Sequence, residues 1–142
     1  MTEIAFHFNA PDKVAYACRL LRKAVRAGSR LVVLGEPALL RQLNEKLWTF
    51  GQLEFVPHCL LPVEPAVSAA SPVVLTDGTH EVPHHEVLVN LDDRVPDGFE
   101  RFARLIEVVS LDEADRQLAR DRWKHYAARG YAIVRHDLKL TS

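Results

Sequence analysis

The first half of the chain alternates between short apolar runs and longer amphipathic stretches. Residues 4–8 have the pattern of a short strand, and Leu31-Val-Val-Leu34 is a continuous apolar run. Between them, residues 12–27 carry apolar side chains at helical spacing and end at Gly28, and a second helical stretch runs from Pro37 to about Trp48. Continuous apolar strands are typical of parallel sheets that helices cover on both faces. This β-α-β-α order predicts an α/β sandwich with a mainly parallel sheet.

The second half is less regular. Residues 61–71 contain two prolines and several small residues, so we expect an exposed loop there. Pro96-Asp-Gly98 is expected to lead into a helix that carries Phe99, Phe102, Leu105 and Ile106. The remaining apolar runs predict short extended pieces or strands at residues 55–58, 73–75, 87–91, 108–109 and 131–134. Neither a repeat nor a low-complexity tract interrupts the sequence, which favours a single domain over residues 1–142.

Composition narrows the class of protein. A chain of 142 residues is long enough for one domain with a real core, and its formal net charge of -1 gives it no overall attraction to nucleic acid. A local basic patch is compatible with that balance. Cys18 and Cys59 form no C-x-x-C pair and are expected to be reduced thiols. The N-terminus lacks a signal-peptide pattern, and no apolar stretch approaches the roughly 20 residues of a membrane span. We therefore expect a cytoplasmic protein without a membrane partner.

His80-Glu-Val-Pro-His84 matches the zinc-protease pattern H-E-x-x-H. That motif requires a helix, which brings both histidines to one face. Here Pro83 lies inside the pattern and disrupts an interior helical turn. We favour a polar connection with clustered histidines, in which His84 and His85 retain the capacity for adventitious metal binding.

Nucleotide chemistry is also poorly supported. Asp92 and Asp93 follow an apolar strand, as magnesium-binding acids do in nucleotide hydrolases, yet no G-x-x-x-x-G-K-[ST] or G-x-G-x-x-G loop accompanies them. The first strand-to-helix turn, Asn9-Ala-Pro11, lacks the glycine that a close pyrophosphate contact needs. We interpret the two aspartates as loop or capping residues. No catalytic residue, metal ligand or cofactor is predicted.

The stretch from Ser110 to Gly130 has the pattern of one complete helix. Ser110 followed by Glu113 matches a capping box, and Gly130 supplies a left-handed stop. Arg116, Arg120 and Lys124 recur every four residues, so they line one face of this helix.

Trp123 borders this cationic stripe. A large aromatic ring beside a row of cations suits a ligand that is partly acidic and partly apolar. The alternative is a solvated helix face with Trp123 covering the edge of the core, and pattern alone favours that alternative. Trp48 and Phe55 pose the same question, since they are either core anchors or part of an exposed apolar patch, and pattern again favours the core.

Two segments resemble the chi subunit of bacterial DNA polymerase III holoenzyme. The first is Leu43-Asn-Glu-Lys-Leu-Trp48 followed by Phe55-Val-Pro-His58, where the family has Leu-Asp-x-x-Leu-Trp, a spacer and Phe-Val-Pro-His. The second is Gln117-Leu-Ala-Arg-Asp-Arg-Trp-Lys-His-Tyr126 followed by Gly130-Tyr131. The family pattern there is Gln-Leu-Ala-Arg-x-Arg-(Tyr/Trp)-Lys-x-Tyr and then glycine with an aromatic residue.

The resemblance implies a Rossmann-like three-layer fold without a nucleotide-binding loop, and a non-catalytic adaptor in DNA replication. Such an adaptor holds the psi subunit of the clamp loader and the acidic C-terminal tail of single-stranded-DNA-binding protein, which ends in Pro-Phe. It contacts DNA indirectly, and an accessory helicase competes with psi. Matching residues implicate Trp48 and Phe55 in psi or helicase binding. Those implicated in tail binding are Val109, Arg116, Arg120, Trp123 and Lys124.

Two other classes stay open on the sequence. One is a module that binds single-stranded nucleic acid directly through the basic helix. The other is a small enzyme with a histidine site.

Overall fold

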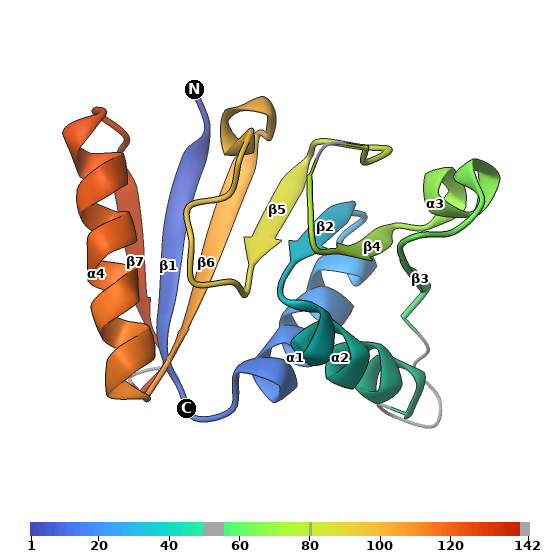
Figure 1. Ribbon diagram of the computed structural model, residues 1–142, viewed down its shortest axis with the longest axis horizontal. Coiled ribbons are helices and arrows are strands. Elements are labelled where there is room, and N and C mark those ends of the chain that lie inside the picture. Colours follow the sequence, from blue (N-terminus) through green and yellow to red (C-terminus); the bar gives the residue numbers. More distant parts are fainter. Residues whose placement is uncertain (50–55, 80, 140–142) are drawn as a thin grey trace.

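The computed structural model describes residues 1–49, 56–79 and 81–139. In these residues, seven strands form one sheet in the order β3-β4-β2-β5-β6-β1-β7, and every neighbouring pair is parallel (Figure 1). The strands are β1 (Glu3–Ala10), β2 (Leu31–Leu34), β3 (His58–Leu60), β4 (Val73–Thr76), β5 (Val87–Asn90), β6 (Arg104–Ser110) and β7 (Ile133–Asp137). The helices are α1 (Lys13–Arg26), α2 (Pro37–Thr49), α3 (Pro65–Ala70) and α4 (Glu113–Ala128), with a 3-10 helix η1 at Phe99–Arg101. The predicted α/β class with a parallel sheet is confirmed.

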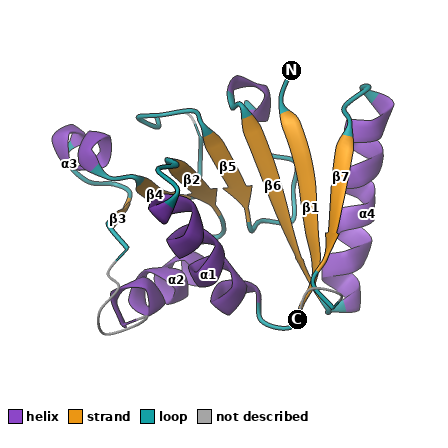
Figure 2. Ribbon diagram, turned by 180° about the vertical axis from the view of Figure 1, so that it is seen from behind, coloured by secondary structure: helices purple, strands orange, loops and turns teal. Residues whose placement is uncertain are grey.

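Helices cover the two faces of the sheet at different ends. The two long helices α1 and α2 pack on one face, and α4 covers the other face beside β1, β6 and β7 (Figures 1 and 2). Alternate residues of each central strand enter the two cores, as Val32 and Val33 of β2 do. Burial on both faces explains why these strands read as continuous apolar runs.

The predicted helix over residues 99–106 is wrong. Only η1 is helical, and Leu105 and Ile106 belong to β6, between β5 and β1. Leu105 enters the core under α4, and Ile106 enters the core under α1 and α2. A short apolar run that is buried on both faces has no period that separates strand from helix, and this ambiguity produced the error.

Two further boundaries differ from the prediction. The expected loop over residues 61–71 contains α3, whose side chains are not buried and which has Pro65 at its first position. The last strand, β7, begins two residues later and ends three residues later than the expected strand at residues 131–134. Cys18 and Cys59 are free and buried.

The predicted capping box at the start of α4 is also wrong. Ser110 is the last residue of β6, and the helix begins at Glu113 with Asp112 as its N-cap. The Asp112 carboxylate accepts a hydrogen bond from the Asp115 N–H at 3.1 Å. The left-handed conformation predicted for Gly130 is confirmed, with φ at 82°.

Candidate functional site

One cavity of about 550 Å³ lies between α4 and strands β1, β6 and β7. The five residues that the sequence implicated in tail binding all line it. The sequence reasoning missed its other lining residues, which come from β1, β7 and α4. The complete lining is Phe6, Phe8, Asn9, Val109, Arg116, Ala119, Arg120, Trp123, Lys124 and Arg135.

The floor of the cavity is apolar and aromatic. The Phe6 and Trp123 ring centroids are 5.1 Å apart, and Phe8 follows Phe6 on the same face of β1. Val109 is buried beside them on β6. Period-two spacing of Phe6 and Phe8 was visible in the sequence, but nothing there placed β1 under α4. The floor therefore offers aromatic surface to an apolar ligand group.

Cations from two elements surround this floor. Arg120 Nη1 lies 3.2 Å from Glu113 Oε1 and 3.0 Å from Gln117 Oε1, and Arg116 Nη1 lies 4.0 Å from Glu113 Oε2. Arg116 and Arg120 are thus both linked to one exposed carboxylate. Lys124 has no ion pair with any residue in the described part of the chain.

The fourth cation of the described lining belongs to β7. The Arg135 guanidinium carbon lies 5.3 Å from the Phe8 ring centroid and 5.9 Å from that of Trp123. These are cation–π distances, so the charge rests against the aromatic floor. The cavity as a whole combines positive charge with an apolar surface.

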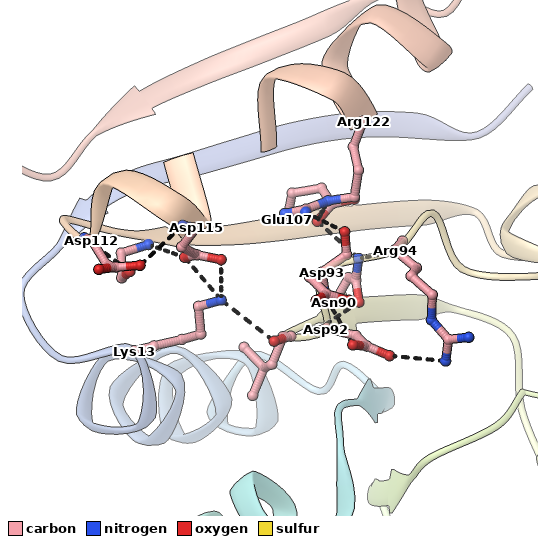
Figure 3. Close-up of polar contacts among 11 residues, drawn as sticks. Lys13, Asn90, Asp92, Asp93, Arg94, Glu107, Asp112, Asp115 and Arg122 are labelled. Atoms are coloured by element: carbon pink, nitrogen blue, oxygen red, sulfur yellow. Dashed lines mark hydrogen bonds and ion pairs between the residues drawn. The ribbon is translucent and has the colours of Figure 1, made fainter. Parts of the chain in front are cut away.

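A buried polar network fixes α4 on the sheet (Figure 3). Glu107 of β6 is fully buried and accepts hydrogen bonds from Arg122 Nε at 3.0 Å, Asn90 Nδ2 at 2.9 Å and the Tyr126 hydroxyl at 2.6 Å. Arg122 Nη1 also donates to the Asp93 carbonyl at 2.8 Å. Arg122 therefore points into the protein although its neighbours Trp123 and Lys124 line the cavity.

The charges in this network oppose one another. Burial is the largest effect and raises the pKa of Glu107 overall, although the Arg122 guanidinium and the hydrogen bonds from Tyr126 and Asn90 oppose the rise. All three neighbours donate, which matches an ionised carboxylate. Burial and the Glu107 carboxylate together raise the pKa of Tyr126, so its hydroxyl stays protonated. Among the described residues, Arg122 Nη2 is a buried nitrogen without a hydrogen-bond partner.

A second contact fixes the first turn of α4 (Figure 3). Asp115 Oδ2 accepts from the Ser110 N–H at 2.8 Å and lies 3.0 Å from Lys13 Nζ of α1. Burial raises the pKa of Asp115, but the Ser110 hydrogen bond and the Lys13 ammonium outweigh it, and the net shift is downward. Both ends of the cavity wall that α4 supplies are thus held by buried or half-buried charges.

Comparison of the sequence with known protein families identifies the family of this chain. Residues 1–134 match the family described as "DNA polymerase III chi subunit, HolC".

The chain belongs to the DNA polymerase III chi subunit family.

Similar proteins include the DNA polymerase III subunit chi of Pseudomonas aeruginosa, 33% identical over 143 aligned residues that cover 97% of this chain and 98% of the relative. The Haemophilus influenzae protein of the same name is 29% identical and covers 82% of this chain and 81% of its own length. The Escherichia coli protein is 25% identical, with 82% and 79% covered. Chi subunits are accessory, non-catalytic subunits of the holoenzyme, so this chi-family chain is a component of DNA replication.

A second and smaller cavity of about 310 Å³ opens beyond the ends of β2, β4 and β5. Its described lining includes Asp77, Asp92 and Asp97, with Arg94 as the cation. The Asp92 N–H donates to Asn90 Oδ1 at 3.0 Å, and its carboxylate lies 3.5 Å from Arg94 (Figure 3). Asp92 thus makes the loop contacts that the sequence suggested.

The histidine-rich segment forms no metalloprotease helix in its described part, residues 81–85. His84 is buried, its Nε2 lies 3.2 Å from the Ser71 carbonyl oxygen, and burial lowers its pKa. Position 80 is outside the described residues. In residues 1–49, 56–79 and 81–139, no group of three or more His, Cys, Asp or Glu side chains is arranged to hold a metal ion.

Trp48 lies on α2, which packs on the opposite face of the sheet from the cationic cavity. Its side chain is 63% exposed and its ring centroid is 5.2 Å from that of His58. The core position that pattern favoured for Trp48 is therefore wrong. Phe55 lies outside the described residues.

No helix in the described part of the chi-family chain is long and apolar enough to cross a bilayer.

Proposed function

We propose that this chi-family chain is a replisome adaptor with two contact surfaces. Its cationic cavity binds the acidic C-terminal tail of single-stranded-DNA-binding protein, and the surface around Trp48 binds a psi-like subunit of the clamp loader. The adaptor reaches DNA indirectly, through the protein that coats the single strand.

The cavity between α4 and the sheet carries the first half of the proposal. A tail that ends in an aromatic residue after several aspartates needs an apolar pocket surrounded by positive charge. Phe6, Phe8, Val109 and Trp123 supply the pocket, and cations border it on two sides. In this proposal the terminal ring packs against Trp123 and Val109, Arg120 and Lys124 receive carboxylates, and Arg116 extends the positive surface.

A fluorescence anisotropy titration with a labelled tail peptide tests the proposal. We expect micromolar affinity, roughly -7 to -8 kcal/mol. Arg120→Glu and Lys124→Glu each convert an attraction into a repulsion and should weaken binding about tenfold or more, on the order of 1.5 kcal/mol. Arg94→Glu is the matched control, because it makes the same charge change in the acidic cavity. Wild-type affinity in both α4 variants would overturn the site assignment.

The same titration with a labelled oligonucleotide tests direct nucleic-acid binding. A module that binds bare single strands through the basic helix should do so without a partner protein, and its affinity should fall steeply with added salt. The adaptor proposal predicts that the peptide binds, that Trp123→Ala weakens it, and that the bare oligonucleotide binds weakly.

The second half of the proposal rests on the exposed Trp48. Large aromatic side chains are enriched where protein partners dock, and the Trp48 side chain is available for such a contact because it is 63% exposed. Trp48→Ala should weaken capture of a purified psi-like subunit while leaving the tail-peptide affinity unchanged. Phe55→Ala is expected to act in the same direction, and unchanged psi capture in both variants would refute this surface.

A further inference from the structure

Arg135 differs from the other cations of the cavity in where its charge lies. It comes from β7 and not from α4, and its guanidinium rests over the rings of Phe8 and Trp123 at 5.3 and 5.9 Å. Both rings line the cavity. A positive charge is therefore fixed directly against the surface on which a ligand's aromatic ring would pack.

Arg116 and Arg120 lie differently. Both are linked to Glu113 at the start of α4. Arg116 precedes Trp123 by seven residues, which separates their Cα atoms by roughly 10 Å along the helix axis. Arg116 therefore extends the positive surface away from the aromatic floor, while Arg120 is held by Glu113 and Gln117.

Among the described residues Arg135 forms no ion pair, so its guanidinium can bind a carboxylate. The Arg135 charge contributes only the last and smallest of the causes that lower the pKa of Asp137, two residues further on, whose carboxylate is hydrogen-bonded to other groups. Its Oδ1 accepts from Asn9 Nδ2 at 2.8 Å and from the Lys139 N–H at 3.0 Å.

The chemistry of a peptide C-terminus connects these observations. In a terminal phenylalanine, the ring and the α-carboxylate are attached to the same Cα, so the group that receives the carboxylate must lie beside the surface that receives the ring. A guanidinium binds a carboxylate through two parallel hydrogen bonds. We infer that Arg135 is the receptor for the terminal α-carboxylate, because its guanidinium lies against the aromatic floor, whereas Arg116, Arg120 and Lys124 of α4 receive side-chain carboxylates upstream. This inference rests on the proposed function, because it assigns a role within the same tail-binding cavity.

A double-mutant cycle between protein and peptide tests the assignment. The protein is wild type or Arg135→Gln, and the acidic peptide ends in Phe as the free acid or as the C-terminal amide. Amidation should weaken binding to wild type about tenfold, and Arg135→Gln should weaken binding of the free acid by a similar factor. If the two groups interact, amidation should cost the Arg135→Gln variant less than about twofold.

A second peptide separates the terminal carboxylate from the side-chain carboxylates. Asp-to-Asn replacement upstream in the peptide should weaken wild type and Arg135→Gln by the same factor. With Arg120→Gln the upstream replacement should cost less than it costs wild type, because one of its receptors is gone, while amidation keeps its full cost. Arg135→Lys should bind the free acid more tightly than Arg135→Gln does, because lysine restores the positive charge but not the two parallel hydrogen bonds of a guanidinium.

Arg19→Gln is the matched control for the loss of a ring-stacked arginine. Arg19 is exposed and lies 6.0 Å from the Tyr16 ring centroid, but on α1 and outside the cavity. It should leave both affinities unchanged. If amidation weakens Arg135→Gln as much as wild type, or costs wild type nothing, the inference is wrong while the adaptor proposal stands. If wild type fails to bind either peptide, both are wrong.

Discussion

The two cavities of this sheet lie near strand carboxyl ends and carry opposite charge. The larger one, under α4, is bordered by cations over an aromatic floor, and the smaller one, beyond β2, β4 and β5, is lined by aspartates. In open α/β sheets the usual ligand crevice lies outside the carboxyl ends of the strands. Here the acidic loops occupy that place, and the surface suited to an acidic ligand lies between a helix and the face of the sheet.

The buried network between the two cavities joins their walls. Arg122 of α4 reaches through to Glu107 of β6 and to the Asp93 carbonyl of the loop beside the acidic cavity (Figure 3). The charge difference between the two cavities therefore depends on the orientation of α4. Because Arg122 faces the interior, Trp123 and Lys124 face the cationic cavity.

The largest effect is expected from Glu107→Ala. It leaves Arg122 buried without its carboxylate, and breaking a buried pair typically costs about 3–5 kcal/mol of unfolding free energy. Urea unfolding measures this. A double variant, Glu107→Leu with Arg122→Met, should regain most of the loss because it removes both charges. A cost below about 1 kcal/mol for the single variant would show that the network does not hold α4 in place.

A smaller effect with a defined pH dependence is expected from Asp115→Asn. The pKa of Asp115 is lowered in the folded state, so its contribution to stability is present above the unfolded-state pKa of about 3.9 and is lost as the pH falls through the folded-state value. Urea unfolding at pH 7 should show a loss of about 1–2 kcal/mol that shrinks below about pH 4. Asp121→Asn, on an exposed position of the same helix, is the control. An equal loss at both pH values would contradict the electrostatic origin.

Glu113→Gln should change the tail-peptide affinity of the cationic cavity in the opposite direction from Arg120→Glu. Glu113 competes with an acidic ligand for Arg116 and Arg120, and exposed pairs of this kind contribute about 0.2–1 kcal/mol. Removing its charge should therefore tighten tail-peptide binding about two- to threefold at low salt. Weaker binding would indicate that Glu113 positions the arginines and does not compete.

The smallest effect is expected in the acidic cavity. Asp97→Asn should alter tail-peptide affinity less than about twofold at physiological salt, where the Debye length of about 8 Å screens charges outside the cationic cavity. The same titration at low salt gives the control, since weaker screening should make any influence of Asp97 visible. A large change at physiological salt would mean that the two cavities act as one site.

Helical spacing was sufficient to find one wall of the cavity. Arg116, Arg120 and Lys124 recur every four residues with Trp123 beside them, and local periodicity fixes which side chains of a helix share a face. The continuous run Leu31–Leu34 was likewise enough to predict a parallel sheet, which the structure confirms. The stripe could be predicted because it depends on the geometry of a single helix, and the parallel sheet because it depends on the burial of a whole strand.

The failures share a physical cause. Residues 104–110 were divided between a helix and a short strand, because their apolar pattern depends on two cores that the sequence does not display. Arg122 reads as one more charge on a basic helix, although it is buried. Trp48 reads as a core residue, although it is exposed.

The sequence by itself determined the class of fold, the stripe of cations on α4 and, through two motifs, the family. Only the tertiary structure placed Phe6, Phe8 and Arg135 opposite that stripe, gave Ser110 to β6 and turned Arg122 inward. The physical reason is that periodicity orients a side chain relative to its own helix or strand. Which other element it then meets depends on the strand order and on the packing of α4, which are set by contacts between residues far apart in the chain.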